Sequence, residues 1–336
     1  MTVPDFSALR VAVVGDLVAD HYLFGEPARL SREAPVMVLR HRRDELGAGG
    51  AANAARNLRS LGANVTVLGV VGRDKSGREL LECLERDGID VAPVETLSGW
   101  STPTKTRILG AEPGRTPQQV LRIDREPAEP VPPEARRLLA GRLNELGACD
   151  AVLVSDYGYG LVGEELAAVA TALRRRGARV VLDPRRCFEP FRGIDAMTPN
   201  LGELALALRR RPEELGGLDE IRSAARELRE RCALEHLLVT LGNRGMLLVS
   251  RDTEEPLHVP SSGSEAVDVS GAGDTAAAAF TLALAAGRPA PFAMRLANAA
   301  SGIVVMEMGA VPCPLDRLRS ALPHVPEPAR AAGVLP

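Results

Sequence analysis

The chain has 336 residues, of which 45% are hydrophobic and 25% are charged, and its formal net charge at pH 7 is −3. This composition is typical of a globular protein, and the near-neutral charge argues against the basic surface that nucleic-acid binding requires. The N-terminus lacks an apolar leader and no uncharged run approaches a membrane span, so we expect a cytoplasmic protein with no membrane partner.

Short apolar runs alternate along the chain with amphipathic stretches of helical period. The strand-like runs cover residues 11–15, 65–72, 151–156, 179–184, 236–242 and 245–250. The helical patterns cover residues 49–63, 76–88, 133–148, 163–178, 218–233 and the stretch after Gly271. Buried strands that alternate with amphipathic helices predict an α/β fold, in which helices cover both faces of a mainly parallel sheet.

Two stretches interrupt this alternation, and each contains two strand-like runs joined by a turn that carries proline or glycine. Neither stretch fits a strand–helix–strand unit, because the helical pattern between the runs is missing. We interpret residues 21–44 and 100–125 as insertions whose strands project from the main sheet as a small lid. The whole then forms a single domain over residues 1–330.

The stretch AVDVSGAGDTAAAAF, residues 266–280, places one carboxylate at the start of an alanine-rich helix. Asp274 is the only acidic residue between Asp268 and Glu307. The GxGxxA spacing also occurs in dinucleotide-binding units, but the acidic residue they carry about 20 positions later is absent here. A P-loop needs a lysine after its glycine, and neither of the chain's two lysines has that spacing.

Two roles for Asp274 are open on this stretch alone. The backbone N–H groups of Gly271, Ala272 and Gly273 would point out of the helix start and could hold an anion. A carboxylate beside an anion is unfavourable unless it accepts a proton, as a general base beside a transferring phosphoryl group does. In the alternative role, the carboxylate only complements the helix dipole.

Further polar residues follow predicted strands. Asp16, Asp156 and Asp183 come at the carboxyl ends of three strands, the edge at which α/β sheets bind ligands. With Asn53 in GAGGAANAA, Asp16 could bind sugar hydroxyls, although each of these residues could also be an ordinary turn or helix-start residue.

A pair of polar residues three positions apart begins another helix, in TPNLGEL. Asn200 and Glu203 could face one side and hold hydrated Mg²⁺ beside a triphosphate. The alternative is an N-cap asparagine supported by a glutamate three residues later.

Taken together, these stretches resemble the ribokinase-like (PfkB) carbohydrate kinases. The matching residues are VVGD at 13–16, GGAANAARNLRSLG at 49–62, the Asn200 and Glu203 pair, and DVSGAGDT at 268–275. They occur in the family's order between about Val11 and Leu322. The resemblance implies a ribokinase-like fold that uses ATP and Mg²⁺, with a monovalent cation as a further candidate cofactor.

The resemblance also assigns roles to individual residues. It implies that Asp274 is the catalytic base, with the anion hole formed by Gly271, Ala272 and Gly273. The implied ATP-binding residues are Asn200, Thr240, Gly242, Gly245 and Asn298, and the metal would be held, through water, by Asn200 and Glu203. The implied sugar-binding residues are Asp16, Gly49, Gly50, Asn53, Asp156 and Asp183. A sugar phosphate needs charge-assisted partners, for which the candidates are Lys105, Arg107, Arg122 and Arg185.

Within the family, the chain most resembles the bacterial kinases of D-glycero-D-manno-heptose 7-phosphate. The resemblance rests on SREAPV (31–36), TPTKTRIL (102–109), QQVLRID (118–124) and VLVSDYGYG (152–160). It implies transfer of the γ-phosphoryl group of ATP to the C1 hydroxyl, which gives the 1,7-bisphosphate. Three positions depart from the usual pattern: Tyr159 and Arg185 each stand where a lysine is usual, and Ser270 replaces a threonine.

The resemblance implies a homodimer formed through the lid. Some relatives carry a fused nucleotidylyltransferase domain, but this chain ends at Pro336, so we expect a separate nucleotidylyltransferase and phosphatase to act downstream. Two alternatives stay open: a ribokinase-like kinase of another sugar phosphate, and a catalytically silent regulator that binds sugar or nucleotide. A dehydrogenase comes third, weakened by the missing ribose-binding acid.

Overall fold

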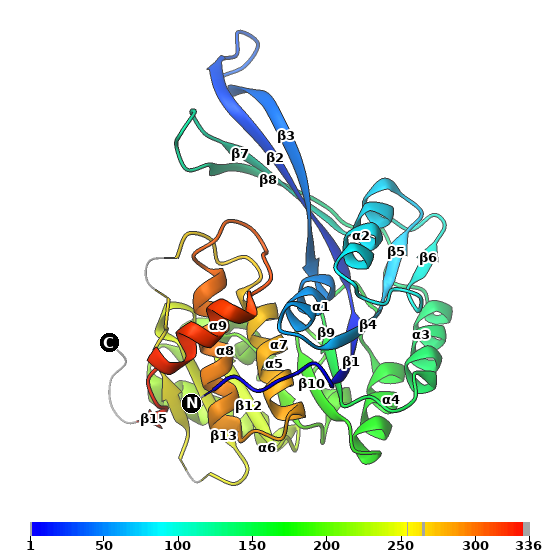
Figure 1. Cartoon of the computed structure of the whole chain (residues 1–336), viewed down its shortest axis with the longest axis vertical. Coiled ribbons are helices and arrows are strands. Elements are labelled where there is room, and N and C mark those ends of the chain that lie inside the picture. Colours follow the sequence, from blue (N-terminus) through cyan, green and yellow to red (C-terminus); the bar gives the residue numbers. More distant parts are fainter. Residues whose placement is uncertain (1, 254, 264–265, 332–336) are drawn as a thin grey trace.

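The computed structural model describes residues 2–253, 255–263 and 266–331. Within these residues the main sheet has nine strands (Figure 1). Their spatial order is β15 (Ala329–Arg330), β14 (Leu257–Val259), β13 (Met246–Ser250), β12 (His236–Thr240), β11 (Ala196–Met197), β10 (Arg179–Asp183), β9 (Ala151–Ser155), β1 (Arg10–Gly15) and β4 (Asn64–Leu68). The strands from β12 to β4 pair in parallel, and β13 to β15 add an antiparallel edge. The predicted α/β fold with a mainly parallel sheet is confirmed.

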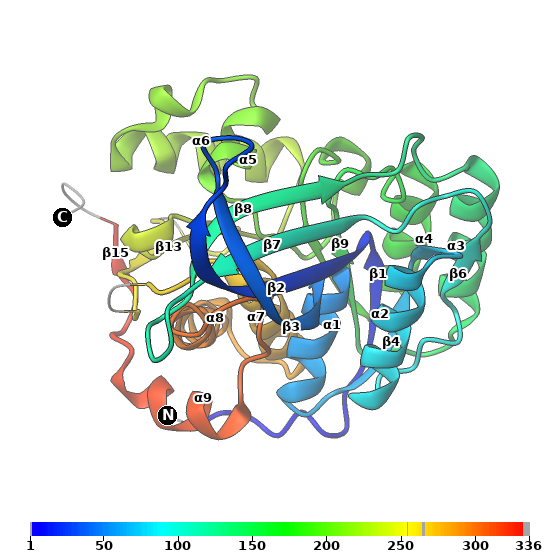
Figure 2. The same ribbon diagram turned by 90° about the horizontal axis from the view of Figure 1, so that it is seen from above.

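Helices cover both faces of this sheet, as Figure 2 shows from above. One face carries α1 (Ala51–Ser60), α2 (Lys75–Arg86), α7 (Ala272–Ala285), α8 (Ala290–Val304) and α9 (Leu315–Ala321). The other carries α3 (Pro133–Glu145), α4 (Glu164–Arg175), α5 (Leu201–Ala207) and α6 (Leu218–Arg231). Single 3₁₀ turns occur at Glu189–Phe191, Pro212–Leu215, Gly242–Arg244 and Leu322–His324. None of the helices in the described ranges is long and apolar enough to cross a membrane.

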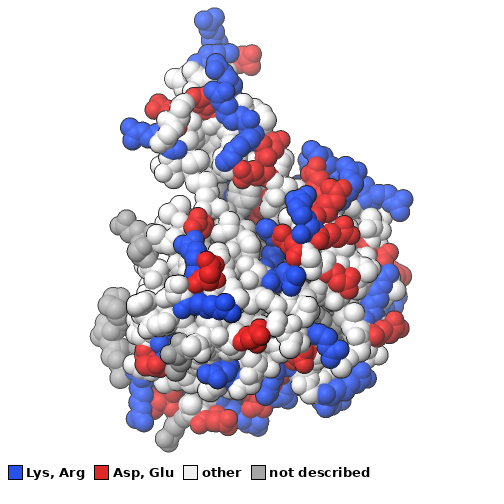
Figure 3. Space-filling view, in the orientation of Figure 1, with Lys and Arg blue, Asp and Glu red and all other residues white. Residues whose placement is uncertain are grey.

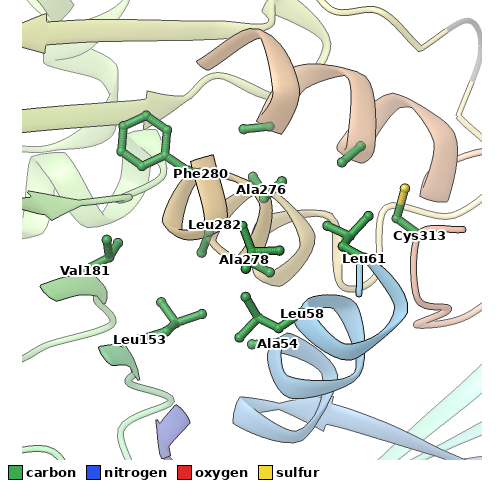
Figure 4. Close-up of a cluster of buried hydrophobic side chains, with 14 of the residues drawn as sticks. Ala54, Leu58, Leu61, Leu153, Val181, Ala276, Ala278, Phe280, Leu282 and Cys313 are labelled. Carbon is green, nitrogen blue, oxygen red and sulfur yellow. The ribbon is translucent and has the colours of Figure 1, made fainter. Parts of the chain in front are cut away.

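The core follows from the two-residue period of the strands. Leu153 of β9 packs into the cluster under α1 and α7, while its neighbour Val152 packs into the cluster under α3 and α4. Figure 4 shows the first cluster, in which Leu58 of α1, Ala278 of α7 and Leu153 come together. The alanines of α7 let that helix approach α1 and the sheet closely, so its first turn is held firmly over the carboxyl ends of the strands.

A second, four-stranded sheet projects from this body (Figure 1). Its spatial order is β3 (Met37–Gly50), β2 (Leu17–Leu30), β7 (Thr104–Gly110) and β8 (Gln118–Arg125). Lysine and arginine side chains gather at its far end (Figure 3). Strand pairs therefore occur at both predicted places, although the first pair is longer than the predicted 21–44 and reaches the carboxyl end of β1 at Gly50.

Two predicted boundaries are wrong, both at glycines. The run 65–72 is two strands, because Gly69 separates β4 from β5 (Val70–Gly72), which pairs with β6 (Glu95–Leu97) in a separate two-stranded sheet. A Cβ on Gly69 would lie 2.6 Å from the Leu17 side chain, so the chain passes tightly against the root of the lid here. The helix predicted from Gly49 begins at Ala51, since Gly49 and Gly50 still pair with β2.

Candidate active site

The parallel strands bring polar residues to one edge of the sheet. Asp16 follows β1, Asp156 follows β9, and Asp183 is the last residue of β10. These three strands are neighbours, and Ser155 is in register with both Gly15 and Asp183. The three carboxylates therefore lie at adjacent strand ends, as the sequence predicts.

Asp274 lies in the first turn of α7 above this edge, and its side chain is only 3% exposed. Its Oδ2 accepts a hydrogen bond from Asn53 Nδ2 and its Oδ1 accepts one from the hydroxyl of Tyr157, both at 2.8 Å. Within the described ranges, no side chain caps the start of α7. Burial raises the pKa of Asp274 to about 7, although both donors oppose this rise. A carboxyl that titrates near neutral pH is suited to accept a proton, which favours the base over the simple dipole partner.

A buried amide network orients Asn53. Asn57 Nδ2 donates to Asn53 Oδ1 at 3.3 Å, and Asn57 Oδ1 in turn accepts from the Thr275 hydroxyl at 3.1 Å. With its oxygen engaged by Asn57, Asn53 presents its N–H₂ group to Asp274. The helix α1 therefore supplies a fixed donor to the carboxylate.

The start of α7 offers free backbone donors. Among the described residues, the N–H groups of Gly271, Gly273 and Asp274 have no acceptor, while that of Ala272 donates to Val269 O at 3.3 Å. Gly271 has a φ of 76°, and a Cβ there would lie 2.4 Å from Asn53 Nδ2, so only glycine fits. Free N–H groups at a helix start attract an anion, and the anion hole stays a prediction, with the Ala272 amide already engaged by Val269 O.

A cavity of about 780 Å³, here called the Thr240 cavity, opens on one side of Asp274. All five predicted ATP-binding residues line it, together with Ala272 and Gly273: Asn200, Thr240, Gly242, Gly245 and Asn298. Its walls come from the β12–β13 turn, the segment after β14, and α8. Asn298 Nδ2 also donates to Pro260 O at 2.7 Å, so it holds the segment after β14 in place.

A smaller cavity of about 380 Å³, the Tyr157 cavity, lies beneath the lid. Three of the predicted phosphate-binding residues line it, with Arg186 beside them: Lys105 of β7, Arg122 of β8 and Arg185. The fourth, Arg107, does not line it. Its guanidinium is buried and pairs with Asp20 at 2.6 Å.

Two predicted sugar-binding carboxylates accept hydrogen bonds from backbone amides, and their contact with a sugar stays a prediction. Asp16 Oδ2 accepts from the N–H groups of Tyr157 and Tyr159 at 2.8 and 3.1 Å, and burial raises its pKa to about 6. Asp156 Oδ2 accepts from the N–H groups of residues 185–187 at 2.8 to 3.0 Å. These carboxylates fix the two loops that carry Tyr157 and Arg185.

Asn200 and Glu203 form the capping box that was the alternative to a metal site. Asn200 Oδ1 accepts from Glu203 N at 2.9 Å, and Glu203 Oε2 accepts from Asn200 N at 2.8 Å. Glu203 Oε1 lies 3.4 Å from the Arg185 guanidinium. No cluster of three or more acidic, histidine or cysteine side chains suited to a metal occurs in the described ranges. Direct ligation of Mg²⁺ therefore does not fit, whereas the remaining oxygen lone pairs fit contact through water.

Sequence reasoning missed two residues that lie at the centre of the site. Tyr157, in the motif SDYGYG, binds Asp274 directly, whereas only its neighbour Tyr159 was singled out. Asp20, on β2, is 4% exposed, and its Oδ2 lies where a Cβ on Gly49 would come within 2.7 Å. Strand alternation was the available signal, since it places Asp20 and Lys105 side by side on one face of the lid.

The chain is 38% identical over 323 residues to the bifunctional protein HldE of Magnetococcus marinus, a match that covers 94% of this chain and 64% of that protein. The chain thus spans less than two thirds of the length of the first curated relatives it matches.

Among solved structures, ribokinase of Arabidopsis thaliana complexed with ribose and ATP superimposes with a TM-score of 0.70 at 22% identity, covering 94% of this chain and 99% of that one. Phosphofructokinase-2 of Escherichia coli in complex with fructose-6-phosphate gives a TM-score of 0.74 at 21% identity, with the same coverage. These two likenesses show the ribokinase-like fold. The pfkB family of carbohydrate kinases matches residues 8–317, and the chain belongs to that family.

Proposed function

We propose that the protein is an ATP-dependent sugar-phosphate kinase in which Asp274 is the general base. The observation that carries this proposal is the position of Asp274 between the two cavities. Its neighbour Gly273 lines the Thr240 cavity, and its hydrogen-bond partner Tyr157 lines the Tyr157 cavity. A phosphoryl group that enters from one side can therefore meet a hydroxyl that enters from the other.

In this proposal ATP occupies the Thr240 cavity, with its γ-phosphoryl group near the free N–H groups of Gly271, Gly273 and Asp274. These amides would stabilise the negative charge on the oxygens of the phosphoryl group in transit. Asp274 takes the proton of the acceptor hydroxyl while the hydroxyl oxygen bonds to phosphorus and ADP leaves. Bound Mg²⁺, contacted through water by Asn200 and Glu203, would shield the phosphate charge.

The acceptor would run from Asp274 into the Tyr157 cavity. Gly49 and Gly50 let the end of β3 lie close against Asp20 and Asp16, and Asp20 and Asn53 would offer an acceptor and a donor to the acceptor's hydroxyls. Lys105, Arg122 and Arg185 supply positive charge at the far side, which suits a terminal phosphate. Such a cavity favours a phosphorylated sugar over a free sugar or a nucleoside.

Among sugar phosphates, the sequence resemblance favours D-glycero-D-manno-heptose 7-phosphate, phosphorylated at C1. An anomeric hydroxyl is more acidic than an ordinary alcohol, so a single carboxylate with a pKa of about 7 is a sufficient base. Tyr159 and Arg185 both line the Tyr157 cavity, so the two departures from the usual lysines fall where the sugar phosphate would be held.

The test is ADP release with ATP and Mg²⁺ over a panel of acceptors. The panel contains D-glycero-D-manno-heptose 7-phosphate, sedoheptulose 7-phosphate, fructose 6-phosphate, ribose and adenosine. We expect turnover with the aldoheptose phosphate at a kcat/KM at least about 10²-fold above that for ribose and adenosine, since these two carry no phosphate group for Lys105, Arg122 and Arg185 to bind.

Turnover with a different sugar phosphate would support the proposed kinase activity and overturn the assignment of the heptose phosphate as substrate. The reciprocal variants Tyr159→Lys and Arg185→Lys would then be tested against the same panel. Binding of sugar and ATP by calorimetry without any ADP formation would contradict the kinase and favour a silent regulator.

We also propose that two copies associate through the lid. All eight residues of β8 are exposed, and Val120, Leu121 and Ile123 each expose more than half of their surface. Strand alternation places Leu121 and Ile123 on the face opposite Arg122, away from the Tyr157 cavity. An apolar face on an open sheet is a common site of association between chains.

The double substitution Leu121→Asp and Ile123→Asp is therefore expected to convert a dimer into a monomer, because it places charge on the apolar face. Sedimentation equilibrium of the two proteins measures the change. Leu138→Asp, at an exposed leucine of α3, is the matched control and should leave the mass unchanged. A wild-type protein that sediments as a monomer at micromolar concentration would contradict the proposal.

A further inference from the structure

Tyr157 occupies an unusual place between the base and the acceptor cavity. Its hydroxyl donates to Asp274 Oδ1 at 2.8 Å, while its ring forms part of the wall of the Tyr157 cavity. The ammonium group of Lys105 lies 5.7 Å from the centre of the ring, within range of a cation–π interaction. The Tyr157 side chain therefore contacts the carboxylate of Asp274 at its hydroxyl and the ammonium group of Lys105 at its ring.

The backbone around Tyr157 is anchored, so the direction of its hydroxyl is set by the fold. The N–H groups of Tyr157 and Tyr159 both donate to the buried carboxylate of Asp16. On the other side, Gly50 comes so close that a Cβ there would lie 3.4 Å from the Tyr157 ring. The loop cannot carry the backbone of Tyr157 away from Asp274 without breaking the bonds to Asp16.

Several charged groups face Asp274 from the elements packed around it. Asp183 lies near it at the end of β10, Asp20 on β2 and Lys105 on β7. Asp20 disfavours the ionised form of Asp274 and Lys105 favours it, while Asp274 in turn helps to raise the pKa of the buried Asp183. Asn53 of α1 and Tyr157 are the two side chains that donate hydrogen bonds to it.

We infer that Tyr157 is a positioning residue that holds the carboxylate of Asp274 unprotonated and aimed at the acceptor hydroxyl. The inference rests on the proposed function, because it concerns the base of that reaction. A donor to a carboxylate oxygen stabilises the ionised form and leaves the second lone pair of that oxygen for the incoming hydroxyl. Burial, followed by the nearby Asp274, raises the pKa of Tyr157 well above 10, so the phenol stays protonated and acts as a donor.

The variant Tyr157→Phe keeps the ring and removes the hydroxyl. Without this donor the ionised form of Asp274 is less stable, so the carboxyl binds its proton more tightly. We expect the acid limb of the kcat/KM profile for ADP release to move to higher pH by about one unit. The rate at pH 6 then falls roughly tenfold, while the rate at pH 9 stays within about threefold of the wild type.

Tyr159→Phe is the matched control, because Tyr159 lies in the same loop and lines the same cavity but makes no bond to Asp274. The apparent pKa of its acid limb should match that of the wild type, and any loss of kcat/KM from its place in the cavity should be equal at every pH. Incorporation of 3-fluorotyrosine at position 157 gives a stronger donor and should move the limb to lower pH. An unshifted limb in Tyr157→Phe, or an equal loss of rate at every pH, would overturn the inference.

Thermal unfolding tests the inference without any turnover. The folded-state pKa of Asp274 is raised above its unfolded value, so its proton stabilises the fold at low pH and that stabilisation is lost as pH rises from about 4 to about 7. Removing the donor raises the folded-state pKa further. We therefore expect the Tm deficit of Tyr157→Phe to be larger at pH 8 than at pH 5. An equal deficit at both would contradict the inference, even if every acceptor tried were the wrong one.

Discussion

Asp274→Asn is expected to lower kcat for ADP release between about 10²- and 10⁴-fold. The amide keeps the size of the carboxyl but cannot take the proton of the acceptor hydroxyl. In the wild type, protonated Asp274 is inactive as a base, so the rate should rise with pH through a pKa of about 7 and then level off. In the variant this acid limb disappears, because the asparagine side chain does not titrate, and the residual rate no longer follows the pKa of residue 274.

The measurement is a pH–rate profile from pH 5.5 to 9 for both proteins, with ATP binding followed by calorimetry. We expect ATP to bind the variant about as tightly as the wild type, because the Thr240 cavity is lined by other residues. Wild-type turnover by the variant would refute Asp274 as the base. Loss of ATP binding together with activity would point to a folding defect instead.

The second large effect is expected on stability, from Arg107→Met. Arg107 and Asp20 form a buried pair, with side chains 9% and 6% exposed. Removing the guanidinium leaves a buried carboxylate without its partner, which typically costs about 3–5 kcal/mol of unfolding free energy. Typical domains have a total stability of about 5–15 kcal/mol, so the loss is a large share of it. Urea unfolding monitored by circular dichroism measures it.

Two controls separate this effect from a general sensitivity of the lid. The double variant Arg107→Met and Asp20→Asn should recover most of the lost stability, because no buried charge is left unpaired. Arg122 and Asp124 form a half-exposed pair within β8, the strand next to that of Arg107. Arg122→Met should therefore change the unfolding free energy by less than about 1 kcal/mol. Equal losses in Arg107→Met and Arg122→Met would show that the buried pair is not special.

Much of the fold could be predicted from periodicity, since buried strands and amphipathic helices each have a recognisable hydrophobic pattern in the sequence. The failures fall where tertiary contacts override the pattern. Gly69 ends β4 because the root of the lid presses against it, and Gly49 and Gly50 belong to β3 because β2 pairs with them. The two-residue strand β11 is too short to leave any period at all.

The site shows the same division. The positions of Asp274 at the start of α7 and of the aspartates at the strand ends could be predicted, because motif spacing and strand order determine them. What each carboxylate binds within the fold depends on loops from other strands, so the amides that Asp16 and Asp156 hold could not be predicted from the sequence. Their role as sugar ligands stays a prediction. Arg107 looks like its neighbours in sequence, and only the pairing of β2 with β7 shows that it is buried against Asp20.

The pairing of β2 with β3 makes the two ends of the lid mechanically unequal. From Leu17 to Phe24 the register is unbroken, and this half carries Asp20 and faces Gly49. Beyond Phe24 two register shifts interrupt the ladder, so bending concentrates in the outer half and does not reach the inner one. The turn at residues 31–36 is therefore the natural place to insert a peptide tag or a fluorophore. We expect such an insertion to report on the outer lid and to leave the pairing of β2 with β3 between Leu17 and Phe24 intact.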